Sequence, residues 1–377
     1  MKIELLQEDL NRGLSIVSRF VASRPQLPVL ANILLKADKN QLHLSATNLE
    51  IGICLDLNAK VVEEGEITVP AKEITELISY LSPGKLTLES KGKAQLKTIW
   101  NGGETVFAGI EASEFPKIPD LPTDSLFSLS VKDLMVAISQ VNFATASDDT
   151  RPVLEAILWS FEKTGYRVVA TDGYRLSLKD VKEAVEVSNG DKPSFLVPGR
   201  SLTEITRLTG DEQQIKVGLT KDKNQVGFIL PGLKLVSRLI EGEFPDYQKI
   251  IPEKSKVTVS LSKDEFYQAI KVASVFSRES ANIVKFDVGK DGLTISANAP
   301  SVGENKTEVS AKIKWQGEVG EDLKIAFNYK FILDFLNAVA DDEQEIVIEL
   351  TEALAPVIFK TSQAAWLHLI MPVRVDL

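Results

Sequence analysis

The hydrophobic positions of the chain change period at regular intervals, from the alternation of a strand to the spacing of a helix. Three segments begin this way: IELLQEDLNRGLSIV at Ile3, FSLSVKDLMVAISQV at Phe127 and VTVSLSKDEFYQAIKVA at Val257. After each strand, apolar residues recur at i, i+4 and i+7, which places them on one face of an α-helix. The pattern predicts buried helical triplets at Leu10/Leu14/Val17, Leu134/Ile138/Val141 and Phe266/Ile270/Ala273.

A second strand-to-helix segment follows each of the first three. These segments are ITVPAKEITELISYL, FLVPGRSLTEITRL and IAFNYKFILDFLNAV, and the tripeptide EFP occurs at 114–116 and again at 243–245. Such markers recur about 130 residues apart, which predicts three copies of one domain. Each copy would contain two β-α-β-β-β units, with two helices against an antiparallel sheet surface. This is an α+β fold.

Segments rich in proline and charged residues mark the limits of the copies. KIPDLPTDS spans 117–125 and KIIPEKSK spans 249–256. We therefore expect domains over residues 1–121, 126–252 and 254–377. Because both linkers are short, the domains are expected to abut. Copies joined head to tail can close into a ring, directly or after dimerisation.

Composition narrows the class of protein. Hydrophobic residues make up 44% and charged residues 25%, as in ordinary soluble globular chains. No apolar run reaches the roughly 20 residues of a membrane span, and the first segment lacks the apolar stretch of a secretory signal. Cys54 is the only cysteine, so no intrachain disulfide can form. We expect a cytoplasmic protein in a reducing compartment.

Residue types suited to catalysis are scarce. The two histidines, His43 and His368, lie in separate strand patterns, and with Cys54 they provide too few ligands for a structural zinc site. The chain has no phosphate-binding P-loop, dinucleotide-binding glycine motif, nucleophile elbow or HExxH motif. The adjacent aspartates at 148–149 and 341–342 are typical of turns and helix caps. We therefore expect no catalytic residue, no metal and no cofactor.

The net charge first argues against a nucleic-acid partner. It is −10, from 43 basic and 53 acidic residues. Domains that bind nucleic acid usually carry a basic face. DNA binding would therefore require that lysines and arginines gather on one surface while acidic residues cover the rest.

Seven segments carry a resemblance to a known family. They are RPQLPVL (24–30), TRPVLEAIL (150–158), VATDGYRLSL (169–178), VPGR (197–200), EGEFPDYQKIIP (241–252), AFNYKFILDFLNA (326–338) and MPVR (371–374). In this order the chain resembles, over its whole length, the bacterial DNA polymerase III beta subunit, the replicative sliding clamp. The resemblance implies a homodimeric ring of six domains, with helices inside and sheets outside, around double-stranded DNA. It implies a processivity factor of the polymerase III holoenzyme, without catalysis or 3'-5' exonuclease activity, on the bacterial nucleoid.

The resemblance also implies a pocket for short linear motifs of partner proteins, where the VATDGYRLSL hairpin meets LIMPVR. The partners would be the replicative polymerase, the clamp loader, and repair and translesion polymerases. An apolar groove with a few polar edges suits a peptide, although its apolar members could be ordinary core residues. The pocket residues implied are Leu154, Thr171, Gly173, Tyr174, Arg175, Leu176, Pro245, Lys249, Ile250, Asn328, Phe331, Leu354, Pro356, Leu369, Ile370, Met371, Pro372, Val373 and Arg374.

For DNA, the resemblance implies phosphate contacts by Arg24, Lys72 and Arg200. Such contacts ignore base sequence and so permit sliding. Other basic residues in or near the expected helices are equally consistent with solvated surface charges. They are Arg12, Arg19, Arg207, Lys271 and Arg278.

For the dimer, the resemblance implies contacts by Val275 and Phe276 with the first domain of the other protomer, and Phe107 is a candidate opposite them. An exposed Val-Phe pair would be a liability in a monomer. The alternative is that both residues cap the core of their own helix.

The chain departs from the family pattern in three places. Asp148 and Asp149 stand in the loop that would approach DNA, which puts that contact in doubt. Ala281 stands where the family often carries a larger residue at the pocket edge. The sequence also continues through Val375-Asp376-Leu377 beyond the usual family ending. The last two departures put the preferred partner motif in doubt.

Two other functions stay open at this point. One is a peptide-binding scaffold of the same fold that never encircles DNA, and the near-equal spacing of the three copies argues against it. The other is an enzyme that uses Asp172 and Arg175 on a phosphate ester. No nucleophile, base or metal set accompanies these two residues in the sequence.

Overall fold

The computed structural model describes residues 1–92, 94–122, 126–148, 150–162, 164–183, 193–290, 292–316, 323–362 and 365–375. It divides into two compact units. The first comprises Met1–Val131 and Arg207–Leu239, and the second comprises Lys132–Thr206 and Ile240–Leu377. Within the described ranges, no helix is long and apolar enough to cross a bilayer.

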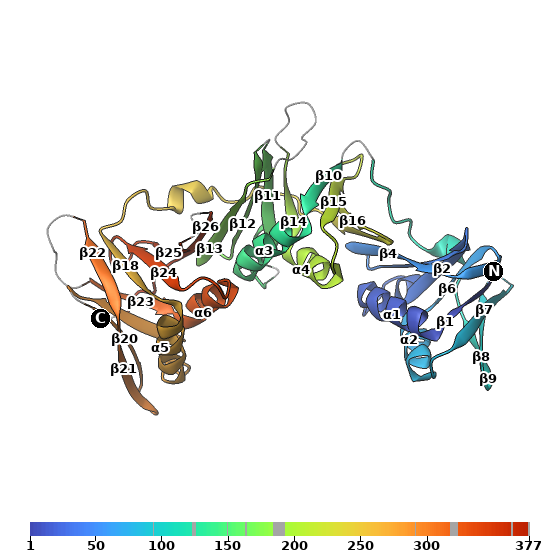
Figure 1. The fold of residues 1–377 in the computed structure, drawn as a ribbon, viewed down its shortest axis with the longest axis horizontal. Coiled ribbons are helices and arrows are strands. Elements are labelled where there is room, and N and C mark those ends of the chain that lie inside the picture. Colours follow the sequence, from blue (N-terminus) through green and yellow to red (C-terminus); the bar gives the residue numbers. More distant parts are fainter. Residues whose placement is uncertain are drawn as a thin grey trace. The chain divides into compact units, whose positions relative to one another are not determined.

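The first unit combines antiparallel sheets with helices (Figure 1). Its elements are β1 (Lys2–Leu6), α1 (Gln7–Val17), β2 (Asn32–Asp38), β3 (Gln41–Thr47), β4 (Ile51–Asn58), β5 (Lys60–Glu63), β6 (Gly65–Pro70), α2 (Ala71–Tyr80), β7 (Lys85–Lys91), β8 (Gln95–Trp100), β9 (Gly103–Ala108), β10 (Leu126–Ser130), β15 (Gln214–Leu219), β16 (Gln225–Leu230) and β17 (Leu233–Arg238). One sheet has the order β5-β1-β7-β8-β9, and the other has the order β10-β15-β16-β17-β4-β3-β2-β6. Helices α1 and α2 pack against each other, and α1 covers β3 and β4.

The second unit also combines antiparallel sheets with helices, and α3 and α4 are given with it although Val131, Arg207 and Leu208 fall in the first unit. Its elements are α3 (Val131–Val141), β11 (Ala156–Glu162), β12 (Gly165–Thr171), β13 (Arg175–Val181), β14 (Ser194–Pro198), α4 (Gly199–Leu208), the 3-10 helix η8 (Tyr247–Ile250), β18 (Val257–Ser262), α5 (Lys263–Val275), β19 (Ile283–Val288), β20 (Leu293–Ala299), β21 (Gly303–Val309), β22 (Ala311–Trp315), β23 (Leu323–Asn328), α6 (Tyr329–Ala338), β24 (Glu345–Leu350), β25 (Val357–Thr361) and β26 (Trp366–Ile370). The sheet orders are β14-β11-β12-β13-β26-β25-β24-β18-β22 and β21-β20-β19-β23.

The helices form where the sequence pattern predicts them. All nine side chains of the predicted triplets are buried, at no more than 2% exposed. The acidic residues that follow the strands fall in the first turns of α1, α3 and α5. A negative charge at that position interacts favourably with the helix dipole. Burial of one apolar face and the negative charge at the helix start therefore both stabilise these helices.

The prediction of an α+β fold in three copies is confirmed. The first copy runs β1-α1-β2-β3-β4 and then β6-α2-β7-β8-β9. The second runs β10-α3-β11-β12-β13 and β14-α4-β15-β16-β17, and the third runs β18-α5-β19-β20-β21 and β23-α6-β24-β25-β26. Strands β5 and β22 are additions that the two-unit pattern did not include.

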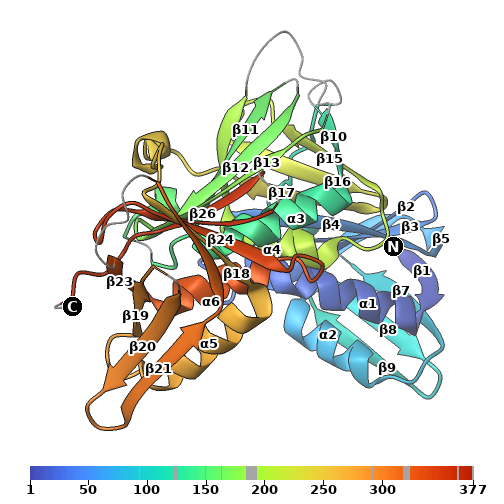
Figure 2. The same ribbon diagram turned by 60° about the vertical axis from the view of Figure 1, so that its left-hand side comes forward.

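Strand pairing joins the copies. β4 of the first copy pairs with β17 of the second, and β13 of the second pairs with β26 of the third. Figure 2 shows β13 and β26 side by side. The central copy is therefore divided between the two compact units, with β10 and β15 to β17 in one and β11 to β14 in the other.

Candidate functional site

The candidate site is built around the turn that joins β12 to β13. Thr171 Oγ1 accepts a hydrogen bond from the Gly173 amide at 3.1 Å and donates one to the Arg175 carbonyl at 2.7 Å. Asp172 Oδ1 accepts from the amides of Tyr174 and Arg175 at 2.9 and 3.0 Å. Gly173 has a φ of 91°, a backbone conformation that would be strained in a residue with a side chain. The local sequence TDGYR thus fixes the turn and leaves Tyr174 63% exposed.

Two carboxylates and two aromatic rings hold Arg175 in place. Its Nε donates to Asp172 Oδ2 at 3.0 Å, and its Nη1 donates to Asp334 Oδ2 at 2.5 Å. The guanidinium carbon lies 4.5 Å from the ring centroid of Phe331 and 5.6 Å from that of Phe143. Charge-assisted bonds and cation–π contacts of this kind orient an arginine strongly. Because Asp172 is fully engaged in the turn and with Arg175, the geometry does not favour the hydrolytic alternative.

β26 and the segment after it bring residues 369–374 beside this turn. In register, Leu176 lies opposite Leu369 and Arg175 opposite Ile370. Beyond the strand, the Met371 amide donates to the Tyr174 carbonyl at 2.8 Å, and the Val373 amide donates to the Ala326 carbonyl at 2.8 Å. The hairpin and LIMPVR therefore meet, as the resemblance implied, with Leu369 and Ile370 in the sheet and the next residues just beyond it.

The expected pocket residues separate into a buried floor and an exposed surface. Val169, Leu176, Leu178 and Leu369 form an apolar cluster, with Phe244, Tyr247, Ile251 and Met371 among the side chains packed on it. The buried members of the expected pocket are Leu154, Thr171, Leu176, Leu369 and Ile370, the half-buried ones are Arg175, Asn328, Phe331, Pro356, Met371, Pro372 and Val373, and the exposed ones are Gly173, Tyr174, Pro245, Lys249, Ile250, Leu354 and Arg374. The buried residues support this surface, and the half-buried and exposed residues form it.

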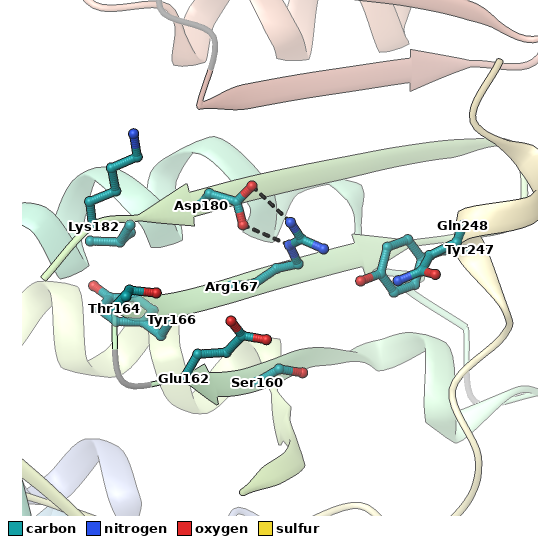
Figure 3. A pocket seen from close by; sticks show the side chains of 11 residues that line it. Ser160, Glu162, Thr164, Tyr166, Arg167, Asp180, Lys182, Tyr247 and Gln248 are labelled. Carbon is teal, nitrogen blue, oxygen red and sulfur yellow. Dashed lines mark hydrogen bonds and ion pairs between the residues drawn. The ribbon is translucent and has the colours of Figure 1, made fainter. Parts of the chain in front are cut away.

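Lys249 and Ile250 are the last two residues of η8. On one face of β11 to β13, Tyr247 and Gln248 of η8 line a polar hollow of about 430 Å³ (Figure 3). There Arg167 donates from Nε and Nη2 to the two oxygens of Asp180 at 2.6 and 3.0 Å. Asp180, and then Tyr247, raise the pKa of Arg167. Through Tyr247, Arg167 links η8 to the sheet. At the end of η8, Ile250 is 41% exposed.

Sequence reasoning missed the residues that orient Arg175. Asp334 lies on α6, 159 residues beyond Arg175, and Phe143 follows α3. No local spacing links positions so far apart. The side chain of Asn328, which is expected in the pocket, also caps α6 by accepting a hydrogen bond from the Lys330 amide at 3.0 Å.

The expected DNA contacts are all exposed: Arg24, Lys72 and Arg200. Lys72 and Arg200 occupy the second position of α2 and α4, and Lys330 occupies the same position of α6. A cation in the first turn of a helix is disfavoured by the helix dipole, whereas a helix N-terminus attracts phosphate. Three cations at equivalent places therefore favour an anionic partner. Lys330 was missed, although FNYK matches VPAK and VPGR in position.

Two strands at sheet edges lie near the expected dimer residues. Phe107, on the edge strand β9, is 9% exposed and turned into its own core, while its neighbour Val106 is 48% exposed. Val275 ends α5 and is 52% exposed. Phe276 packs on the apolar core of the third copy and lies beside Gly303, at the start of the edge strand β21.

The positions that depart from the family pattern have local explanations in part. Asp148 accepts hydrogen bonds from the hydroxyl and the amide of Thr150, which lower the pKa of its carboxyl group. Ala281 is exposed and has a φ of 54°, which alanine rarely adopts. Asp149, Asp376 and Leu377 lie outside the described residues. Within the described ranges, no three His, Cys, Asp or Glu residues are grouped to hold a metal ion.

Comparison with known proteins identifies the family. Models of the N-terminal, central and C-terminal domains of the DNA polymerase III beta subunit match residues 1–119, 128–246 and 248–374. The chain is 32% identical to the beta sliding clamp of Synechocystis sp., with 99% of each chain covered. It is 30% identical to the beta sliding clamp of Staphylococcus epidermidis, with 94% of each covered.

A solved structure agrees with these matches. The DNA polymerase sliding clamp from Bacillus subtilis is 27% identical, with 100% of both chains covered and a TM-score of 0.93. The three α+β domains, their order and their fold are thus shared over the whole length. The chain belongs to the DNA polymerase III beta subunit family, the beta sliding clamps.

Proposed function

We propose that the chain is a processivity factor of a replicative DNA polymerase, a sliding clamp that keeps the enzyme on double-stranded DNA. This is the function of the family to which it belongs, and the family is not catalytic. In the proposed organisation, the domains span 1–121, 126–252 and 254–377. The clamp works in the cytoplasm on the nucleoid, without a cofactor.

The observation that carries a ring is the repeated strand junction. β4 pairs with β17, and β13 pairs with β26. In each case the last strand of the first β-α-β-β-β unit of one copy pairs with the last strand of the second such unit of the next copy. The same rule leaves β21 of the third copy and β9 of the first as the unused equivalents, both at sheet edges. Pairing β21 of one chain with β9 of a second, and the reverse, uses every such edge. Two chains then close a six-domain ring.

The exposed surface around the two unpaired edge strands, β9 and β21, is apolar. Val275 and Val302 are each 52% exposed, and Val106 of β9 is 48% exposed. Phe276 lies beside the start of β21. Apolar surface around an unpaired strand edge is costly in water and favours burial in a dimer. These observations support the assignment of Val275 and Phe276 to the interface. Phe107 would contribute indirectly, because it is buried in its own core and holds β9 in place.

Inside such a ring, DNA would meet basic side chains and no base-reading groups. Arg24, Lys72 and Arg200 are the proposed phosphate contacts, and Lys330 completes the set by its equivalent place on α6. Phosphate contacts are independent of sequence and weaken with salt, as sliding requires. The net charge of −10 discourages binding elsewhere on the surface.

Partner proteins would dock on the surface around Arg175 as short peptides. Tyr174, Ile250 and Leu354 offer exposed apolar area at 63, 41 and 58%. The fixed guanidinium on one face of β13 and the apolar cluster on the other face give this surface a preformed shape, which lowers the entropy cost of binding. We propose the replicative polymerase as the first partner, and the clamp loader, repair polymerases and translesion polymerases as others that share the surface.

Retention on DNA circles tests the encircling function. The protein is placed on a nicked plasmid circle by a clamp loader and separated from free protein by gel filtration at moderate salt. A topological link predicts that it stays with the circle and is lost when a restriction enzyme cuts the plasmid once. Equal retention on cut and uncut DNA, or loss from both, would favour the non-encircling peptide scaffold.

A further inference from the structure

A second hollow, of about 450 Å³, lies within the second unit, away from the proposed peptide surface. It is bounded by α3, by the end of β13 and by the turn that follows α6. The charged side chains along it are Lys132, Asp133, Lys179, Lys182, Asp342 and Glu343, with Asp180 at its edge. Neither the DNA surface nor the peptide surface uses this hollow.

Lys179 is the unusual member of the group. Its residue is 8% exposed, and in the sheet it lies between Val168 and Trp366, which are each 1% exposed. Within the described ranges, no hydrogen bond or ion pair holds its ammonium group. Its side chain is largely removed from water and borders the hollow, and a charge in such a place without a polar partner is unfavourable.

The neighbouring carboxylates compensate for this burial only in part. Asp180 is next along the strand, so its side chain points to the opposite face, where Arg167 binds both of its oxygens. Glu343 accepts from Ser362 Oγ at 2.8 and 3.1 Å. Burial lowers the pKa of Lys179, against the opposing charges of Asp133 and Asp180.

We propose that Lys179 is a site of covalent acylation by small activated acyl compounds, acyl phosphates or thioesters. The neutral amine attacks the acyl carbon, a C–N bond forms, and the C–O or C–S bond breaks. The phosphate or thiolate leaves with the electron pair, and the proton from nitrogen passes to water. The hollow has room for a short acyl chain, and the amide product removes the unpaired charge from the sheet.

Labelling of the intact protein tests the proposal without a variant. The protein is treated with acetyl phosphate near neutral pH, and acetylation at each lysine is followed by peptide mass spectrometry. Lys132 and Lys182 line the same hollow but are exposed, so they serve as matched controls. We expect several-fold faster acetylation of Lys179, with the ratio falling as pH rises and the exposed amines lose their protons. A rate at Lys179 equal to or below that of the two controls would overturn the proposal.

A pair of variants tests the energetic reason separately. Lys179→Gln carries the neutral amide that acylation produces, whereas Lys179→Arg keeps the charge. We expect the Gln variant to unfold at a higher urea concentration than the Arg variant. The reverse order would show that the charge is not penalised at this place, and the proposal would lose its basis.

Discussion

Among single residues, His368 is the one whose chemistry conflicts most with its surroundings. It is fully buried, and neither ring nitrogen has a hydrogen-bond partner among the described residues. Its ring stacks on Phe335 at 5.5 Å between centroids and lies 5.1 Å from the ring of Phe143. Burial, and then the charge of Arg175, lower its pKa to about 3. His368 is therefore neutral and packs as an aromatic core residue beneath the candidate peptide surface.

This environment predicts a loss of stability in mild acid. The unfolded chain binds a proton at His368 near its ordinary pKa of 6.5, whereas the folded chain does so only near 3. The free energy of unfolding should therefore fall as pH decreases through this window, by up to about 1.4 kcal/mol per pH unit from this group. Urea unfolding between about pH 7 and pH 5 measures the slope.

The control is His368→Phe, which keeps an aromatic ring in the stack and cannot take a proton. Its unfolding free energy should depend less on pH than that of the wild type over the same window. Parallel curves for the two proteins would mean that His368 gains its proton in the folded state as readily as in the unfolded one.

At this scale, local pattern predicted some residues and not others. The core triplets of the helices follow from spacing, because burial of a helix face depends on neighbours three and four positions away. The conformation of Gly173 follows from the TDGYR turn for the same reason. Asp334 and Phe143, which orient Arg175, could not be predicted, since the contacts arise only when distant segments meet.

Among the elements, β26 and the residues after it complete the candidate site. Met371 and Val373 are each tied by one backbone hydrogen bond, to Tyr174 and to Ala326. Trp366, at the start of β26, donates from Nε1 to Ser177 Oγ across 189 residues of sequence. The strand itself is thus anchored independently of the segment that follows it.

Shortening the chain separates these two parts. A protein that ends at Ile370 keeps β26 but loses the segment that borders Tyr174. We expect its affinity for a polymerase-derived peptide to fall at least about tenfold, or about 1.4 kcal/mol, with little change in its unfolding. A protein that ends at Arg374 should bind like the full chain. Fluorescence anisotropy with a labelled peptide measures both, and equal affinities would place the peptide elsewhere.

The order of elements was predictable, but the pairing of copies was not. Period and turn residues identify strands and helices because each depends on near neighbours. β4 with β17 and β13 with β26 are pairs between strands far apart in sequence, and antiparallel edges of similar composition could be matched in several ways. The division of the central copy between two units therefore emerged only from the structure.

For the whole molecule, the proposed dimer depends on an apolar patch at the end of α5. We expect Val275→Asp to weaken the dimer strongly, because an unpaired charge would be buried against the partner. Val136→Asp is the matched control, since Val136 is 40% exposed on α3 of the second copy, which takes no part in the proposed contact. Analytical ultracentrifugation across a concentration series measures the effect. If both variants stay dimeric at the same concentrations, the interface has been misplaced.

The divided central copy also has a consequence for truncated forms of the protein. A fragment limited to residues 126–252 would contain complete β-α-β-β-β units, yet β13 would lose β26 and β17 would lose β4, which leaves one edge of each strand unpaired. Each would present a long row of free amides and carbonyls, the template on which cross-β aggregates grow. Such a fragment would precipitate or insert its edges into intact chains during their folding. Proteolysis near the two linkers would thus release a product that interferes with assembly of the uncut protein.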